Sequence, residues 1–257
     1  MTVTESTDQP IVKPLRPRAK AATALLACVV AVALYSLSAD LTQLDVVSRI
    51  ADGERVSLQE ATDSDDKVAG AATIYLVVGL IAGITFLLWW SRIYRNIVPL
   101  GVERPRWGAR WAVAYWLIPI ISLFRPKQVA NDIWRGSDPD APQSSAGWES
   151  RPVTPLLNWW WALFVLDMFI GNLAIRSAFD GNTPDDLVSE ATAYVITDIA
   201  DGALAVFTIV VIWAMTRRQE ARIAKLTTTG ARGVTSAPAV AEEPVLEAAS
   251  VPPPAGG

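Results

Sequence analysis

The stretch that determines how this chain is arranged is Trp107-Gly-Ala-Arg-Trp-Ala-Val-Ala-Tyr-Trp-Leu-Ile-Pro-Ile-Ile-Ser-Leu-Phe-Arg-Pro-Lys127. Its uncharged core runs from Trp111 to Phe124 and is interrupted by Pro119. A spanning helix needs about 20 apolar residues, whereas a run of roughly 10–14 is more often re-entrant or interfacial. Proline also removes a helical hydrogen bond and favours a bend. We therefore expect residues 109–124 to dip into a membrane and turn back, with a full crossing as the alternative.

The composition indicates an integral membrane protein. Of the 257 residues 51% are apolar, eleven are tryptophans, and the apolar residues are gathered in long blocks. The net charge of −4 provides no basic face for nucleic acid. The chain has no histidine, and its one cysteine, Cys28, lies inside an apolar block, so the commonest metal ligand and general base are missing. We expect no metal, no cofactor and no enzymatic activity.

Four further blocks are long and apolar enough to predict transmembrane helices: residues 21–38, 68–90, 156–175 and 191–215. The first block has a basic flank and small residues near Ala39, so a cleavable signal peptide is an alternative. Its length and the poor fit of Leu37 before such a cleavage site favour a helix. Residues 1–20 and 226–257 are polar or low in complexity, and we expect both tails to be disordered.

The charges around these blocks predict the orientation. Lysine and arginine collect in segments that precede residue 21, follow residue 90 and follow residue 215. The loops at 40–67 and 177–190 are acidic, and basic loops favour the cytoplasm. If residues 109–124 turn back, every basic cluster lies on one side. We therefore expect a multi-pass protein of the cell membrane with both termini cytoplasmic, and an amphipathic surface helix over residues 126–136.

Packing and topology are expected to depend on a few small, bent or aromatic residues. Gly79 and Gly83 form a Gly-x-x-x-Gly pair, which lets two helices approach closely. This pair could pack within one chain, against a second copy, or against another membrane protein. The other residues of this kind are Trp116, Pro119, Pro126 and Trp134. The lipid bilayer is the one partner that the sequence directly predicts.

Acidic residues inside the apolar blocks suggest a site that binds protons or a cation. A charged carboxylate at the bilayer centre costs about 2.5–3.5 kcal/mol or more, so such residues are usually buried and often functional. The candidate intramembrane polar site comprises Asp167, Asp198, Asp201, Asn172, Arg176 and Tyr194. Asp167 and Asp198 are expected at a similar depth on neighbouring helices, where they could share a proton or bind a cation. The alternatives are hydrogen bonds that only fix helix packing, or an Asp198 that is wetted near the surface.

A set of residues in the middle of the chain carries a family resemblance: Arg92, Arg95-Asn96, Leu100-Gly101, Trp111, Trp116-Leu-Ile-Pro119, Leu123, Arg125-Pro126, Trp134 and Trp159-Trp160-Trp161. With these residues the chain resembles an uncharacterised, DUF4328-like family of multi-pass membrane proteins of actinobacteria. The resemblance covers roughly residues 21–221. It implies several spans and no assigned activity, so it transfers no catalytic residue.

The sequence thus predicts an all-α membrane protein with four transmembrane helices, a re-entrant or interfacial helical element between the second and third, and disordered termini. The favoured function is a non-enzymatic scaffold or regulator, with partner capture expected to depend on Trp116, Pro119 and Trp134. The alternative is a small proton- or cation-linked transporter or channel-like protein that uses Asp167 and Asp198. A lipid-modifying enzyme, the weakest class, would need a polar pocket near Arg92 and Arg95.

Overall fold

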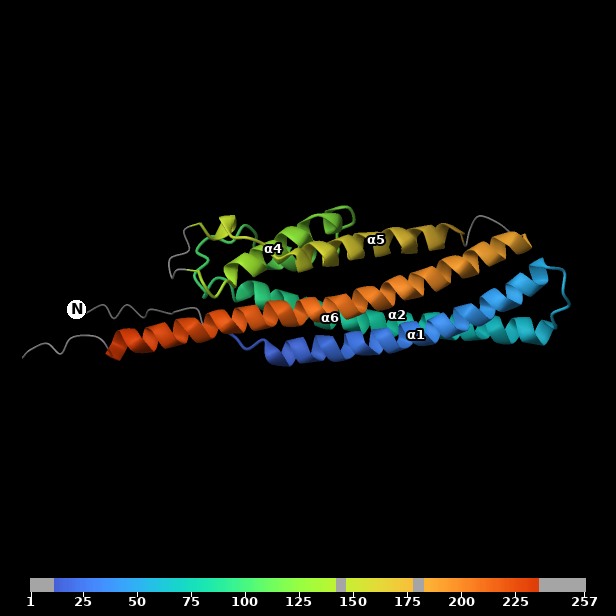
Figure 1. The fold of residues 1–257 in the computed structure, drawn as a ribbon, viewed down its shortest axis with the longest axis horizontal. Coiled ribbons are helices and arrows are strands. Elements are labelled where there is room, and N and C mark those ends of the chain that lie inside the picture. The colour runs from blue at the N-terminus through green and yellow to red at the C-terminus, as the bar shows by residue number, and fades with distance from the viewer. Residues whose placement is uncertain (1–11, 142–146, 178–182, 236–257) are drawn as a thin grey trace, which may run out of the picture.

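The computed structural model describes residues 12–141, 147–177 and 183–235, with side chains up to residue 228. All regular elements in these ranges are helical (Figure 1). The long helices are α1 (Arg16–Ala51), α2 (Leu58–Arg95), α5 (Pro155–Ser177) and α6 (Pro184–Thr235). Between α2 and α5 lie the short elements α3 (Ala109–Ala114), η1 (Ile121–Leu123), α4 (Arg125–Gly136) and η2 (Trp148–Ser150).

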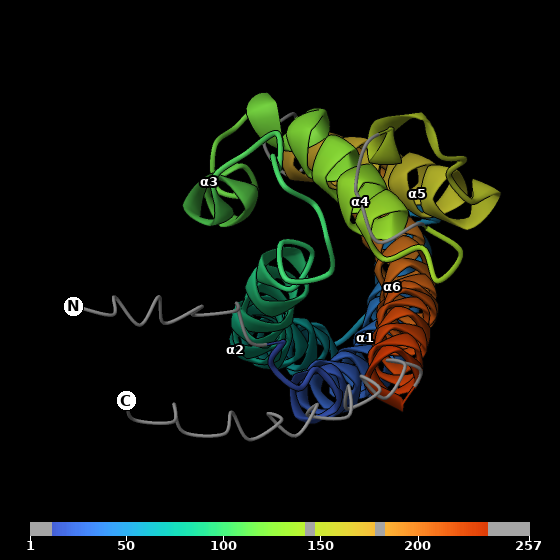
Figure 2. The ribbon, with the colours of Figure 1, turned by 90° about the vertical axis from the view of Figure 1, so that its left-hand side faces the viewer.

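Seen end-on, the long helices form an open arc (Figure 2). α1 packs along both α2 and α6, and α5 packs along α6, so α2 and α5 stand at the two ends of the arc. All four long helices contain a segment apolar enough to cross a membrane. Large apolar side chains such as Leu80 and Leu173 point outward, which suits contact with lipid. The expected all-α architecture with four apolar helices is confirmed.

The helices extend well beyond the apolar blocks, which corrects several expected boundaries. Residues 16–20 belong to α1 and residues 226–235 to α6, so neither segment is part of a disordered tail. The expected loop over residues 40–67 is mostly helical, and Pro184–Glu190 opens α6. Ser57 caps the N-terminus of α2, since its hydroxyl accepts the Glu60 amide at 3.1 Å. The rest of both expected tails, residues 1–11 and 236–257, lies outside the described residues.

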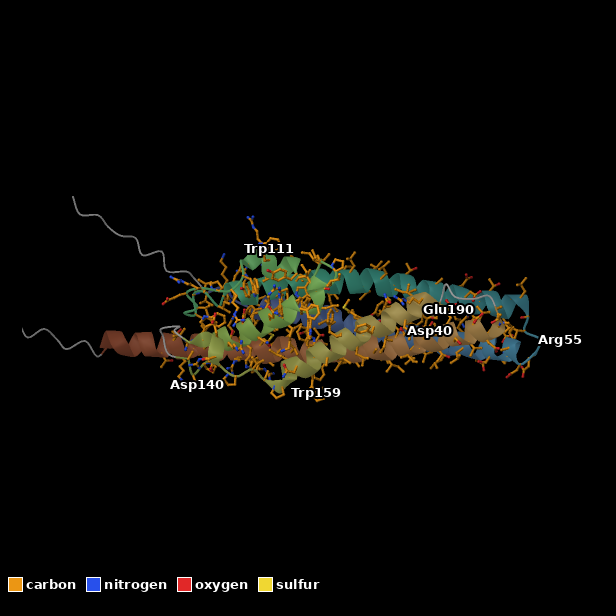
Figure 3. All side chains as sticks on the ribbon, turned by 90° about the horizontal axis from the view of Figure 1, so that it is seen from above. Asp40, Arg55, Trp111, Asp140, Trp159 and Glu190 are labelled. Carbon is orange, nitrogen blue, oxygen red and sulfur yellow. The ribbon has the colours of Figure 1, made fainter. Side chains whose placement is uncertain are left out.

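Most of the basic clusters lie at one end of the bundle, which we call the basic end. There Arg16 of α1 pairs with Glu220 of α6, and Arg218 stacks on Trp134, with its guanidinium 4.4 Å from the ring. The opposite, acidic end holds the α1–α2 turn. There Arg49 forms ion pairs with Asp45, Glu54 and Glu60. In Figure 3, Arg55 marks the acidic end, whereas Asp140 and Trp159 lie toward the basic end.

Residues 107–124 form a hairpin that leaves the basic end and comes back to it. The guanidinium of Arg125 lies 4.6 Å from the Trp107 ring, so the two ends of the segment meet. Trp116 reaches between α2 and α5, and Trp161 Nε1 donates to the Leu123 carbonyl at 3.2 Å. At the tip, Ile120 adopts a φ of 66°, a left-handed conformation that a β-branched residue rarely takes. The chain thus doubles back in the structure, and that it does so within a bilayer stays a prediction.

The hairpin tip is less covered than expected. Broken backbone at membrane depth should be buried in protein, yet Leu117 is 72% and Ile120 74% exposed. The Ile120 carbonyl accepts the Leu123 amide and the Pro119 carbonyl accepts the Ile121 amide, so local turns supply these hydrogen bonds. The tip therefore meets its surroundings with apolar side chains, while local turns satisfy several of its backbone groups.

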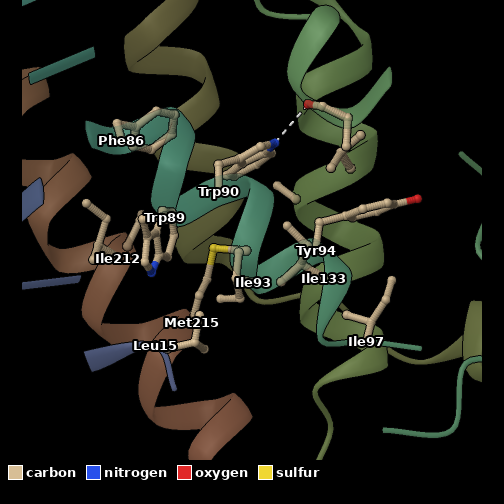
Figure 4. Close-up of a cluster of buried hydrophobic side chains, with 14 of the residues drawn as sticks. Leu15, Phe86, Trp89, Trp90, Ile93, Tyr94, Ile97, Ile133, Ile212 and Met215 are labelled. Atoms are coloured by element: carbon tan, nitrogen blue, oxygen red, sulfur yellow. Dashed lines mark hydrogen bonds between the residues drawn. The ribbon is translucent and has the colours of Figure 1, made fainter. Parts of the chain in front are cut away.

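The main core lies at the basic end and is built around the last turns of α2 (Figure 4). Trp90 Nε1 donates to the Ala112 carbonyl at 3.0 Å, which ties the hairpin to α2. Gln219 of α6 is completely buried and donates to the Ile93 carbonyl and the Ser137 hydroxyl. It also accepts from Asn96 at 3.1 Å. These bonds join α2, α6 and the end of α4 into one rigid unit.

α4 occupies the expected position of the amphipathic helix, with Pro126 in its first turn, but its polar side is not wholly outward. A charged residue of an amphipathic surface helix is expected on its outer side, whereas Asp132 is fully buried together with Val129 and Ile133. The reason is that the segments before α3 and after α4 fold over this helix. Arg106 Nε lies 3.7 Å from Asp132 Oδ1, and Trp148 covers the same region.

Candidate functional site

An acidic cluster lies between the four long helices, and each of them contributes to it. Asp40 comes from α1, Tyr75 from α2, Asp167 from α5, and Asp198 and Asp201 from α6. The carboxyl groups form two pairs, Asp40 with Asp198 and Asp167 with Asp201. The hydroxyl of Tyr75 donates to Asp201. We call these five residues the carboxyl cluster.

The carboxyl cluster is largely shielded from solvent and has no lysine or arginine beside it among the described residues: Asp40 is buried, and its other members are half-buried. Asp40 is 7% exposed, and the atoms Asp167 Oδ1 and Asp198 Oδ2 accept no hydrogen bond from an amide or hydroxyl donor of the described residues. No lysine or arginine of the described chain forms an ion pair with any of the four acids. Two carboxylates within hydrogen-bonding reach cannot both be ionised in such surroundings, so each pair should hold a shared proton.

A cleft opens beside the cluster, inside the arc of helices. Its volume is about 410 Å³, and it is lined by all four long helices and by the hairpin tip. Tyr75 and Asp201 lie at its polar part, and Phe86, Trp116 and Phe164 form its aromatic walls. Trp116 stands edge-on to Phe86 and to Phe164, with ring centroids 5.2 and 5.5 Å apart. The hairpin thereby bounds the cleft toward the basic end.

The model of a family described as a domain of unknown function, DUF4328, matches residues 52–217. The chain belongs to the DUF4328 family. No curated protein and no solved structure matches the chain. The DUF4328 match contains the hairpin, the cleft residues of α5 and most of the carboxyl cluster, whereas Asp40 precedes it. The expected family is confirmed, and its actinobacterial origin stays an expectation.

Within the DUF4328 protein the acids pair differently from the sequence-based expectation. Asp167 was expected beside Asp198, whereas it faces Asp201, one turn further along α6. Asp198 instead faces Asp40 of α1. The sequence interpretation missed Asp40 because it was assigned to an outer loop, and it missed Tyr75 inside an apolar block. The signal for Asp40 was present, since Ala33, Ser36 and Asp40 recur at helical spacing and are all buried.

The other predicted polar residues lie at the margin of the cluster or outside it. Asn172 and Arg176, two members of the candidate polar site, are exposed, and Arg176 forms no ion pair with an acid of the described residues. Tyr194 donates to Glu190 at 3.0 Å and lies near enough to Asp40 for an electrostatic interaction. Figure 3 places Asp40 and Glu190 in the same region of the bundle.

The packing residues also differ in role. Gly79 and Gly83 line the cleft, and a methyl group added at either would meet nothing within 4 Å, so they do not mediate close helix packing within the chain. Trp116 packs internally, and Trp134 lies beneath Arg218. Pro119 is exposed at the hairpin tip. Both tryptophans are half-buried and pack against other side chains of the chain, and Trp116 also lines the cleft.

Proposed function

We propose that this DUF4328 protein is a non-enzymatic membrane protein that binds and releases protons at the carboxyl cluster, as part of a small proton-linked transporter. The observation that carries the proposal is the pairing of four acids from three helices, one buried and three half-buried, without a basic partner among the described residues. We put this function ahead of a scaffold, because Trp116 and Trp134, which were expected to capture partners, each pack against side chains of the same chain and are only partly exposed.

Protons suit this arrangement better than a metal ion. A buried carboxylate without a counter-charge is costly, and a proton held between two carboxyl groups removes one of their two charges. A divalent metal would need several oxygen ligands converging on one point. Over the described ranges, no group of three or more candidate ligands has that geometry. The two separate pairs instead offer two places where a proton can be held and released.

The proposal is tested with purified protein in sealed vesicles that contain a pH-sensitive dye. After a pH gradient is imposed, wild-type vesicles should move protons faster than protein-free vesicles. Asp198→Asn and Asp201→Asn should each slow this movement at least about tenfold, because an amide cannot exchange a proton at this site. Asp66→Asn, at an exposed position of α2, is the matched control and should behave as wild type.

A second measurement detects the protonated carboxyl groups directly, so it does not depend on supplying a transported substrate. Infrared spectra of the protein should contain the carbonyl band of protonated carboxyl groups at neutral pH, and Asp201→Asn should weaken that band. Wild-type protein without such a band and without proton movement would refute the proposed function.

The orientation belongs to the same proposal. We infer that the basic end faces the cytoplasm of the cell, because it holds most of the lysines and arginines that follow the spans. Reporters fused after Arg135 and after Lys225 should both be cytoplasmic. An external reporter after Arg135 would mean that residues 109–124 cross the membrane.

A further inference from the structure

The cleft beside the carboxyl cluster has the composition of a ligand site. Most of its lining is apolar or aromatic, with Leu26 and Val29 on its α1 side and Trp160 on its α5 side. Asp201 is the acidic residue among the lining residues, and no lysine or arginine lines the described cleft. Ligand pockets are typically about 300–1,000 Å³, mostly apolar, with a few placed polar groups. The 410 Å³ cleft fits that description.

We propose that this cleft binds a lipophilic organic cation, such as a bulky ammonium or phosphonium compound. Its positive charge would lie at Asp201, and its apolar groups would lie against the rings of Trp116 and Phe164. The argument is charge complementarity: a carboxylate and several aromatic faces both attract a cation, and both line the same described cleft. An anion would find no lysine or arginine among the described lining residues and would lie beside the Asp201 carboxyl group.

The other occupants of an apolar cleft fit less well. A lipid acyl chain would fill the aromatic part but would leave the Asp201 carboxyl group against hydrocarbon. A small inorganic cation would use the carboxyl group and leave the aromatic wall without a role. A cation with bulky apolar groups satisfies both parts at once.

This inference rests on the proposed function and names its substrate class. Asp201 is paired with Asp167, receives a hydrogen bond from Tyr75, and has Asp198 one turn away on α6, which in turn faces Asp40. When a cation binds, its charge replaces that of the proton shared by Asp167 and Asp201, and this proton leaves. One positive charge enters and one departs, so the local charge is unchanged. Binding should therefore strengthen as the pH rises.

The test uses the full chain in lipid nanodiscs and measures equilibrium binding of tetraphenylphosphonium. Tetraphenylborate, which has nearly the same shape and the opposite charge, is the matched probe. We expect saturable binding of the phosphonium that is at least about tenfold tighter than that of the borate. Asp201→Asn should weaken phosphonium binding about tenfold or more, because it removes the charge that the ligand pairs with.

A second variant tests the location without altering any acid. Gly79→Leu places a side chain in the cleft, and there is room for its Cβ, so the fold should be retained. It should weaken phosphonium binding about tenfold. Gly70→Leu is the matched control, because Gly70 is also on α2 and equally free of neighbours within 4 Å but does not line the cleft. It should bind as wild type does.

The outcomes distinguish this inference from the proposed function. Equal binding of both probes, or full binding by Asp201→Asn, would identify an apolar site for lipid chains and overturn the inference. No phosphonium binding by wild-type protein that still moves protons would overturn the inference and leave the proposed function standing. If wild-type protein moved no protons but bound phosphonium in a manner that depends on Asp201, the proton-linked function would be rejected and the cation site would be retained.

Discussion

Asp132 should make the protein less stable as the pH rises, and Asp132→Asn should remove that loss. The side chain is fully buried on α4, and neither of its carboxylate oxygens accepts a hydrogen bond from the described residues. Arg106 Nε, 3.7 Å away, is too distant for a hydrogen bond. The ionised form of Asp132 is therefore poorly solvated in the folded protein.

The size of the effect follows from the pKa. Burial raises the pKa of Asp132 from the ordinary value of 3.8 to about 6, although Arg106 and Arg135 oppose the rise. The folded protein thus holds this proton more tightly than the unfolded chain does. Its contribution to stability is complete below about pH 4 and is lost as the pH rises through about 6. A difference of about two pKa units corresponds to a loss of about 3 kcal/mol above pH 7.

The assay is unfolding of the detergent-solubilised protein, followed by tryptophan fluorescence at pH 5 and pH 8. The stability of Asp132→Asn relative to wild type should increase by about 1–1.5 kcal/mol between these two pH values. Any cost of the asparagine amide is the same at both, so it cancels. Asp66→Asn, an exposed substitution, should give no such change. A wild-type protein that gains stability over the variant as the pH rises would refute the reasoning.

Three further predictions concern packing, and unfolding in the same detergent measures each. Trp116→Ala should cost about 2–3 kcal/mol because its ring packs among aromatic side chains from two helices, whereas the exposed Trp111→Ala should cost less than about 1 kcal/mol. Gln219→Leu should cost about 2–3 kcal/mol, since it leaves several buried polar groups without partners; an unchanged midpoint would contradict that role. Gly136→Ala should destabilise by about 1–3 kcal/mol, because its new Cβ would lie 2.9 Å from a valine methyl group. Gly79→Ala, with open space around it, should be neutral or slightly stabilising.

The positions of the four long helices could be predicted because their signal is local. A helix satisfies its backbone groups within its own segment, so a long apolar run in a bilayer predicts a helix wherever that helix packs. The Ser57 cap was equally readable, since it depends on two residues three apart. The ends of the helices could not be predicted in this way. Beyond their apolar blocks α1 and α2 continue side by side, and there they pack through polar residues such as Ser64.

Asp167, Asp198 and Asp201 were visible in the sequence as acids inside apolar blocks, and so was the short, proline-broken core of the hairpin. Which acid faces which depends on how each helix is rotated about its axis and on which helices are neighbours. The tertiary structure brings Asp40 to Asp198 because α1 packs along α6. It also leaves Gly79 facing a cleft, because α2 and α5 stand at opposite ends of the arc. Periodicity along one chain carries no information about such contacts between distant segments, whereas hydropathy is a property of each segment alone.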